Sequence, residues 1–167
     1  MRSRAPAKVR IRPGTEADID DIVRIAEAIW RHSLAQVMGL DGEDWPRLAG
    51  QLHADLIPIA REVLVAAQAS RAVGYSYRRG AMIDDLWVDP LFQGAGIGPQ
   101  LLWAQVAAIA AEGHRTASLE CLEGNIEARR FYEREGWRPV YRYARALRLF
   151  PQSIPRIRFE YDVWRSR

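Results

Sequence analysis

The feature that most constrains this chain is a set of alternating glycines, Gly94, Gly96 and Gly98, between an apolar strand and a helix. Glycine has no side chain, so the backbone N–H groups of such a loop can approach an anion closely. The N-terminus of the following helix adds a partial positive charge of about +0.5. The segment therefore predicts a site for a pyrophosphate, with a plain tight turn as the alternative interpretation.

Two common nucleotide-binding loops do not match this segment. A P-loop requires glycine and lysine followed by serine or threonine, and Gly98-Pro99-Gln100 supplies neither the lysine nor the hydroxyl. The dinucleotide fingerprint G-x-G-x-x-G needs its third glycine one position later than Gly98. That fingerprint also belongs to the first unit of a parallel sheet, whereas three expected antiparallel strands precede the loop here.

The rest of the chain alternates between strand and helix patterns. Expected strands cover 9–12, 62–67, 72–77, 82–88, 116–121, a segment that begins near 140, and 157–163. Expected helices cover 19–30, 45–59, 97–112 and 125–135, with a loop over 31–43. Short separators favour an antiparallel meander over 62–88, and a right-handed crossover follows it. This order predicts an α+β fold of three layers, α/β/α, with a mixed central sheet of about seven strands.

Length and composition fit a single domain over 9–167 after a short, basic, disordered tail over 1–8. The net charge is +3 and the arginines are spread along the chain without a nucleic-acid motif, so no nucleic-acid partner is expected. No apolar run approaches the ~18 residues that span a bilayer, so no membrane partner is expected. One cysteine, Cys121, rules out an internal disulfide and favours a reducing, cytoplasmic location.

Two motifs of this chain resemble those of one family. Residues 88–98, from Val88-Asp89-Pro90 to Gln93-Gly94-Ala95-Gly96-Ile97-Gly98, are similar to the coenzyme A loop, Q/R-x-x-G-x-G/A, of the GNAT N-acetyltransferase superfamily. Residues 119–137 resemble that family's second motif. The resemblance extends over roughly residues 8–164. It implies the GNAT acyl-CoA N-acyltransferase fold, acetyl-CoA or coenzyme A as cosubstrate, and no metal.

The resemblance also implies which residues bind the cosubstrate. They are Leu86, Trp87, Val88, Gln93, Gly94, Ala95, Gly96, Ile97, Gly98, Pro99, Asn125 and Arg129. The strand end over 86–88 is expected to carry a bulge and to present the Val88 N–H to the thioester oxygen. The family often places arginine or lysine in and after the loop, where this chain has Gly94, Ala95 and Pro99. This departure predicts fewer donors to the phosphates.

Acetyl transfer to an amine requires a proton acceptor for the amine and a proton donor for the leaving thiolate. By resemblance Tyr132 is the expected acid, because a phenol with a pKa of about 10 stays protonated at neutral pH. A core tyrosine is the alternative interpretation. Glu120 matches the position of a glutamate that protein N-terminal acetyltransferases of this family use, and it is the expected base. Asp84, Asp85 and Glu123 are its rivals.

The expected function is acetyl transfer to a primary amine, a small molecule or a peptide N-terminus, by direct attack in a ternary complex. One alternative is a catalytically weak GNAT-fold module that binds acyl-CoA and regulates. Another is an acyltransferase that uses a longer acyl-CoA. A homodimer is also compatible with the sequence.

The sequence constrains the identity of the acceptor substrate least. By resemblance, the substrate pocket is built by the segment that carries Trp30, His32, Trp45 and His53, although each of these alone is more often a packing residue. Carboxylates gather at the two strand ends around the expected opening. They would attract a cationic amine, so a positively charged acceptor is predicted.

Overall fold

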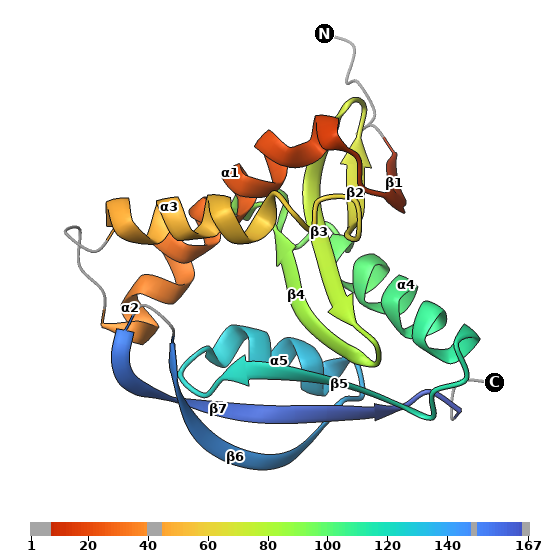
Figure 1. Cartoon of the computed structure of the whole chain (residues 1–167). Helices are drawn as coiled ribbons and strands as arrows, with labels where there is room; N and C mark the ends of the chain where they lie inside the picture. The colour runs from red at the N-terminus through yellow and green to blue at the C-terminus, as the bar shows by residue number, and fades with distance from the viewer. Residues whose placement is uncertain (1–7, 40–44, 148–149, 165–167) are drawn as a thin grey trace, which may run out of the picture.

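The structure, a computed structural model, describes residues 8–39, 45–147 and 150–164 (Figure 1). The strands are β1 (Val9–Pro13), β2 (Leu64–Gln68), β3 (Arg71–Arg79), β4 (Met82–Val88), β5 (Thr116–Leu122), β6 (Arg138–Leu147) and β7 (Phe150–Asp162). The α-helices are α1 (Ile19–Ile29), α2 (Ala35–Met38), α3 (Trp45–Leu56), α4 (Ile97–Ala111) and α5 (Ile126–Arg134). Shorter helical turns are η1 (Glu16–Asp18), η2 (Trp30–Leu34) and η3 (Pro90–Phe92).

The seven strands form one sheet in the order β1-β2-β3-β4-β5-β7-β6. Strands β4 and β5 pair in parallel, whereas the other neighbouring pairs are antiparallel. The predicted meander over β2–β4 and the predicted crossover β4–α4–β5 are both confirmed. The chain adds one feature that linear order does not reveal, because β7 lies between β5 and β6.

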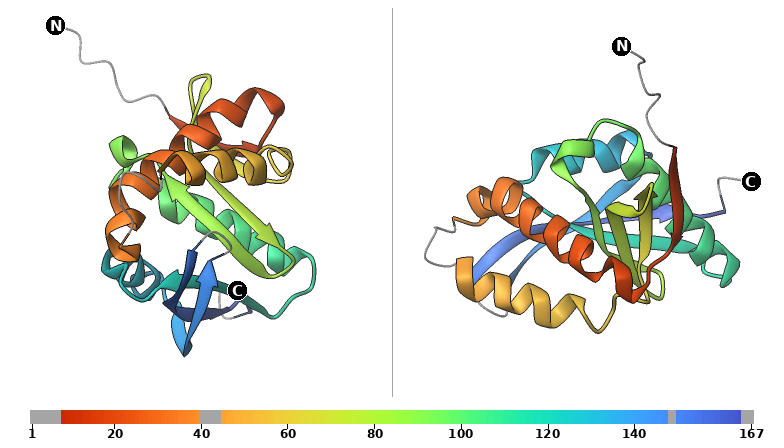
Figure 2. Two further views of the ribbon diagram at one scale, coloured as in Figure 1. Left: turned by 60° about the vertical axis from the view of Figure 1, so that its left-hand side comes forward. Right: turned by 90° about the horizontal axis from the view of Figure 1, so that it is seen from above.

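Helices cover both faces of the sheet (Figure 2). On one face, α1 and α3 pack through Ile22 and Leu56 on Val65 and Tyr75 of the strands. On the other face, α4 and α5 pack on β4, β5 and β7, with Phe159 at the centre of the cluster. Each such buried apolar side chain contributes about 1.5–3 kcal/mol to folding. The predicted three-layer α/β/α arrangement is therefore confirmed.

The sheet opens between β4 and β5. The two strands pair only through Met82 with Ser118 and Ile83 with Leu119, whereas β5 pairs with β7 along its whole length. The partner strand β3 shows why β4 turns away. Tyr77 pairs with Asp85 and Arg78 pairs with Ile83, so Asp84 is an extra residue in β4. A β-bulge of this kind bends its strand and increases its twist.

The position of this bulge corrects one prediction. The bulge was expected over 86–88 and lies at Asp84, because Leu86 and Val88 keep regular pairing with β3.

A second correction concerns residues 31–43, which were expected to form a loop. The chain stays helical through η2 and α2 up to Gly39, whose positive φ of 66° ends the helix. No glycine or proline interrupts residues 30–38, so nothing in this stretch breaks the helix earlier. Residues 40–43 of the expected loop lie outside the described part.

Strand β7 is also longer than predicted. It begins at Phe150 instead of near 157 and forms a long hairpin with β6. Pro155 obscures the strand pattern in the sequence, yet its carbonyl accepts the Glu123 N–H at 2.9 Å. In the described ranges, no helix is long and apolar enough to cross a lipid bilayer.

Candidate active site

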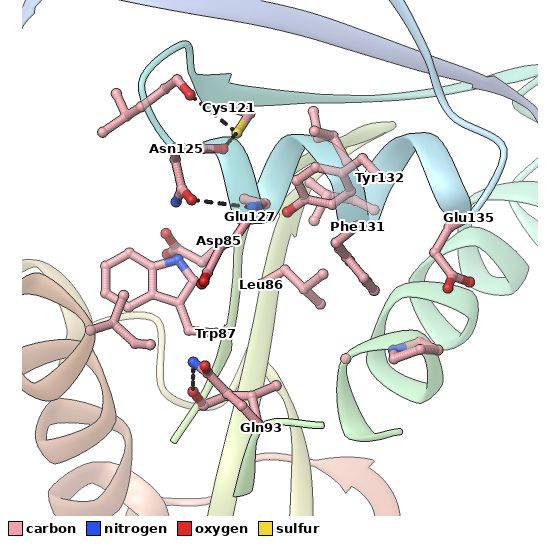
Figure 3. Close-up of a pocket in the computed structure, with 18 of the residues that line it drawn as sticks. Asp85, Leu86, Trp87, Gln93, Cys121, Asn125, Glu127, Phe131, Tyr132 and Glu135 are labelled. Atoms are coloured by element: carbon pink, nitrogen blue, oxygen red, sulfur yellow. Dashed lines mark hydrogen bonds between the residues drawn. The ribbon is translucent and has the colours of Figure 1, made fainter. Parts of the chain in front are cut away.

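A cavity of about 620 Å³ occupies the gap between β4 and β5 (Figure 3). Its walls come from α1, η2 and α2, from β4 and the glycine loop, and from β5, α5 and β7. Most of the predicted site residues line it, namely Leu86, Trp87, Val88, Gln93, Gly94, Gly96, Ile97, Gly98, Pro99, Glu120, Asn125 and Tyr132. Two predicted residues, Ala95 and Arg129, are not part of its wall.

The glycine loop has the geometry that an anion site requires. Gly94 and Gly96 have positive φ angles of 77° and 75°, a conformation that favours glycine. Their backbone is exposed, and Ile97 is buried and anchors the start of α4. In the described part of the chain no backbone acceptor pairs with the amides of residues 93–96. These free N–H groups at a helix N-terminus fit a pyrophosphate.

Pro99 lies in the first turn of α4 and lines the same cavity. It has no N–H, so the first turn offers one donor fewer to an anion. Its fixed φ suits this helical position. The local structure is therefore kept, and the smaller number of donors to the phosphates stays a prediction.

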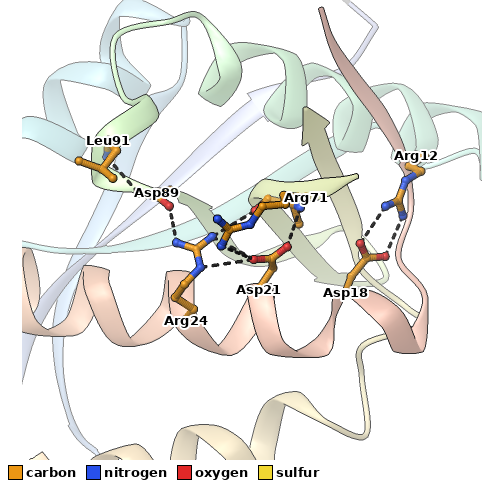
Figure 4. Close-up of polar contacts among 8 residues, drawn as sticks. Arg12, Asp18, Asp21, Arg24, Arg71, Asp89 and Leu91 are labelled. Atoms are coloured by element: carbon orange, nitrogen blue, oxygen red, sulfur yellow. Dashed lines mark hydrogen bonds and ion pairs between the residues drawn. The ribbon is translucent and has the colours of Figure 1, made fainter. Parts of the chain in front are cut away.

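A polar network fixes the strand end from which this loop departs (Figure 4). Arg24 of α1 contacts the carboxylate of Asp89, which also accepts the Leu91 N–H at 3.0 Å. The same guanidinium contacts Asp21, and Asp21 accepts the Ala72 N–H of β3 at 3.0 Å. Asp89 is 3% exposed, so its charge depends on this pairing. The network connects α1, β3 and the β4–loop junction into one rigid unit.

Backbone amides of β4 face the open gap. The Asp89 N–H donates to the Val73 carbonyl, which fixes the alternation of hydrogen bonds between β3 and β4. In an antiparallel pair, every second residue turns its N–H and C=O away from the partner strand. Leu86 and Val88 are therefore the residues whose amides face away from β3, toward the departed β5. The Gln93 side chain donates to the Val88 carbonyl at 3.2 Å from the same side.

Asn125 caps α5 by accepting the Ala128 N–H at 3.1 Å. This leaves its side-chain NH2 group unused by the cap. Arg129 instead donates to the Glu123 carbonyl at 3.2 Å and supports the turn between β5 and α5. Gly124 in this turn allows a close approach of α2, because a Cβ there would lie 2.8 Å from Val37 Cγ1.

Tyr132 lies on α5 with its ring among Phe131, Trp137 and Phe159. The ring packs in the core, as the alternative interpretation expected, and the residue also lines the cavity, so the acid role stays a prediction. Burial raises the pKa of Tyr132 well above its ordinary value, and the neighbouring Cys121 and Asp85 add to the effect. The hydroxyl is thus protonated at neutral pH and available as a donor.

The bulge brings Asp85 to the opposite face of the sheet from Tyr132. Ile83 packs with α4 and α5, and without an extra residue Asp85 would share that face. Instead Asp85 shares the face of Trp87, which packs against the α1 cluster. Its carboxylate has no hydrogen-bond or ion-pair partner among the described residues. Burial, with the charge of Asp84, raises the pKa of Asp85 to about 7.

Glu120 lies on the same face as Asp85, across the gap. Its neighbours Leu119 and Cys121 pack toward α5, so Glu120 points the other way. Arg145, Arg156 and Arg158 surround its carboxylate at 3.6, 3.9 and 3.7 Å. The Tyr143 hydroxyl lies beside it without completing a hydrogen bond. Glu120 is thus a counterion for an arginine cluster, which the sequence did not predict.

The other rival carboxylates are also occupied. Asp84 pairs with Arg79, with Nε and Oδ2 2.6 Å apart, and Glu123 pairs with Arg142 at 3.0 Å. Asp85 is therefore the rival that stays unpaired among the described residues. These pairs remove the basis of the predicted cationic acceptor, because arginines neutralise most of the carboxylates that were to attract it.

Cys121 lines the cavity beside Tyr132, and its thiol is buried. Burial raises the pKa of Cys121 to about 11. A thiol with that pKa is almost wholly protonated at neutral pH and is a poor nucleophile. An acyl-cysteine intermediate is therefore disfavoured at this position.

The helical side of the cavity is aromatic and apolar. Trp30 lines it together with Trp87, their ring centroids 6.2 Å apart, and Met38 of α2 closes the wall. The two histidines predicted near this pocket do not line it. His32 contacts the Ala28 carbonyl at 2.9 Å, and His53 faces Glu27 at 3.6 Å. The side chain of Trp45 lies outside the described part.

Several lining residues were missed by the sequence analysis. They are Ile29, Met38, Phe92, Glu127, Phe131, Arg134, Glu135 and Arg156. A signal for Arg156 existed in the sequence, because residues 156–163 alternate strictly and place it opposite the core residues Ile157 and Phe159. The alternation could not show that β7 lies between β5 and β6 and therefore borders the cavity.

The comparisons with known proteins agree with this geometry. A family model described as an acetyltransferase (GNAT) domain matches residues 60–139. No curated protein matches the sequence significantly. The apo-form solution structure of YjaB from Escherichia coli has 20% identity and a TM-score of 0.76, covering 92% of this chain and 97% of that one.

Two further structures were solved with the cosubstrate. The PaiA N-acetyltransferase of Thermoplasma acidophilum, in complex with coenzyme A, has 15% identity and a TM-score of 0.74, covering 92% of this chain and 99% of that one. The acetyltransferase yncA of Salmonella typhimurium, with acetyl-CoA, has 15% identity and a TM-score of 0.66, covering 94% and 95%. Identities this low establish the shared fold, and the family model adds the motif-bearing segment. Residues 60–139 thus match the GNAT acetyltransferase domain, and the chain shares the fold of these acetyltransferase structures.

Proposed function

We propose that this protein is an N-acetyltransferase that transfers the acetyl group of acetyl-CoA directly to a primary amine. The observation that carries the proposal is the parting of β4 and β5 after Ile83 and Leu119. It opens one cavity that has free loop amides at one mouth and contains Tyr132 and Asp85, both with raised pKa values.

The donor side is built from backbone. The amides of the glycine loop and the N-terminus of α4 would hold the phosphates. The outward-facing amides of Leu86 and Val88, with the Asn125 side chain, would bind the amide-rich arm. Acetyl-CoA supplies the acetyl group as a thioester. An N–H of β4 directed at the thioester oxygen would stabilise the negative charge that develops there.

The two ionisable groups divide the proton transfers between them. Asp85 accepts the proton that the amine loses as its nitrogen bonds to the acetyl carbon. Tyr132 donates its hydroxyl proton to the sulfur as the carbon–sulfur bond breaks. A base with a pKa near the working pH and an acid that stays protonated are the combination that general acid–base catalysis requires.

We place the base at Asp85 and assign Glu120 a different role. Three arginines already compensate the Glu120 carboxylate, whereas Asp85 has no such partner among the described residues. Glu120 holds these arginines in position along the cavity wall.

A free, buried thiol at Cys121 accords with a reducing compartment, and we propose a cytoplasmic location.

The test is thiol release from acetyl-CoA over a panel of primary amines, together with calorimetric binding of acetyl-CoA. We expect binding without any amine and thiol release that depends on one. The same panel with longer acyl-CoA donors separates acetyl transfer from transfer of longer chains. Binding of acetyl-CoA with no amine-dependent release would identify a binding module and overturn the proposal.

A further inference from the structure

A cluster of charged side chains from β5, β6 and β7 beside the cavity carries more positive than negative charge. Arg145, Arg156 and Arg158 share the Glu120 carboxylate, and the second carboxylate nearby, Glu160, lies 3.9 Å from Arg158. Each contact to Glu120 is longer than a hydrogen bond, at 3.6–3.9 Å. One carboxylate at such distances cannot satisfy the donors of several guanidinium groups, since each carries five.

Arg156 is the member of this cluster that reaches the cavity. Its side chain is 14% exposed, and its Nε is buried without a hydrogen-bond partner. Burial and the charge of Arg145 lower the pKa of Arg156 from its ordinary value. A desolvated cation of this kind is stabilised by a close anion, and a guanidinium binds a carboxylate through two parallel hydrogen bonds.

The opposite wall carries the complementary charge. Asp85 on β4 and Arg156 on β7 both line the cavity and both point to the α1 face of the sheet. Trp30 of η2 and Met38 of α2 cover the same side. The acceptor end of the cavity therefore has a carboxylate on one wall, a guanidinium on the other, and an apolar cover.

We propose that the acceptor is an amine that also carries a carboxylate, as free amino acids do. Arg156 binds the acceptor's carboxylate while its amino group faces Asp85. The inference rests on the proposed function, because it assigns the substrate class of that same site. It replaces the expectation of a purely cationic acceptor with a zwitterionic one.

The experiment compares each L-amino acid with its own amide, which keeps the amine and side chain and removes the negative charge. We measure kcat/KM for both, expressed per unprotonated amine, at saturating acetyl-CoA. For the best acceptor we expect the free acid to exceed its amide by about 10- to 100-fold, the range for a hydrogen-bonded charge pair.

Variants then assign this preference to one residue. Arg156→Gln should lower the acid-to-amide ratio toward one, and Arg156→Lys should keep part of it. Arg142→Gln is the matched control, because Arg142 is an exposed arginine of the same hairpin that pairs with Glu123 and does not line the cavity. Its ratio should equal that of the wild type.

The outcomes separate the two proposals. Equal rates for acids and amides, or a ratio that survives Arg156→Gln, would overturn the carboxylate-bearing acceptor and leave the acetyltransferase intact. Faster reaction of amides or of diamines would overturn it as well. If acetyl-CoA binds but no amine of any kind accelerates thiol release, the proposed function itself fails.

Discussion

The two walls of the cavity are built from different chemical material. The β4 wall and the loop after it offer backbone amides, with Gly94 and Gly96 in left-handed conformations. The β5–β7 wall offers charged side chains, with Glu120 among three arginines. A backbone site needs a local sequence with the right glycines, whereas a side-chain site needs several strands brought into register.

This difference has a functional consequence. A wall of amides would bind features that every acyl-CoA shares, the phosphates and the amide-rich arm. A wall of side chains can change its charge by substitution without altering the strands that carry it. We therefore expect donor recognition to depend on backbone geometry and acceptor choice to depend on the residues of β7 and the helical cover.

The largest effect that we predict is for the hydroxyl of Tyr132. Tyr132→Phe keeps the packed ring and removes the proton donor, so turnover should fall by about 10²- to 10⁴-fold with little change in the affinity for acetyl-CoA. Steady-state kinetics and calorimetry measure the two effects. Tyr141→Phe, on an exposed residue of β6, is the control. Unchanged turnover in Tyr132→Phe would return this residue to a purely structural role.

A smaller effect should appear in stability at Asp85. The folded pKa of about 7 exceeds the ordinary value, so the folded state holds a proton more tightly and loses stability as pH rises through 7. Asp85→Asn should therefore raise the free energy of unfolding at pH 8 by about 1–3 kcal/mol and change it little at pH 4. Urea denaturation at both pH values measures this.

Asp18 provides a contrast of opposite sign. Its pKa is lowered to about 2 by its hydrogen bonds with Arg12. The ionised carboxylate therefore stabilises the folded state at pH values above the ordinary pKa of aspartate, and this stabilisation is lost as the pH falls toward 2. Asp18→Asn should destabilise the protein at pH 8. If both variants shift stability in the same direction at that pH, the proposed difference between a paired and an unpaired carboxylate is wrong.

The smallest effect concerns the glycine loop. Gly96→Ala should weaken acetyl-CoA binding by about tenfold, because alanine strains the left-handed backbone and displaces the amides. Gly80→Ala in the β3–β4 hairpin is a matched control, with a similar positive φ and open space around the Cβ position. Both variants should lose about 1 kcal/mol of stability, and only Gly96→Ala should change binding. Equal affinities would mean that the loop does not contact the phosphates.

Local sequence was sufficient to predict the donor side. The alternation of glycines after a strand predicted the loop, and resemblance to the family's second motif predicted Asn125 and Tyr132 as site residues, both of which line the cavity. The meander and the crossover followed from short separators and a single long helix. Each of these features depends on residues that are close together in the chain.

The acceptor side depended on long-range contacts that the sequence does not encode in a readable pattern. Glu120 was expected to be the base, and the insertion of β7 beside β5 surrounds it with arginines from β6 and β7. Asp85 remained one of several candidate bases because strand alternation alone did not show on which face of the sheet its side chain lies. One extra residue at Asp84 decides that face, and a bulge of this kind leaves no local sequence signal.

The most direct measurement of the central claim is the pH dependence of kcat/KM with two acceptors that differ in amine pKa. If Asp85 is the base, wild-type activity rises through a pKa near 7 that is the same for both acceptors. In Asp85→Asn the rise near pH 7 should disappear, and kcat/KM should rise only with deprotonation of the amine, at a pH that differs between the two acceptors. Glu120→Gln should retain the rise near pH 7. A rise that persists in Asp85→Asn and disappears in Glu120→Gln would contradict the account and move the base to the other wall.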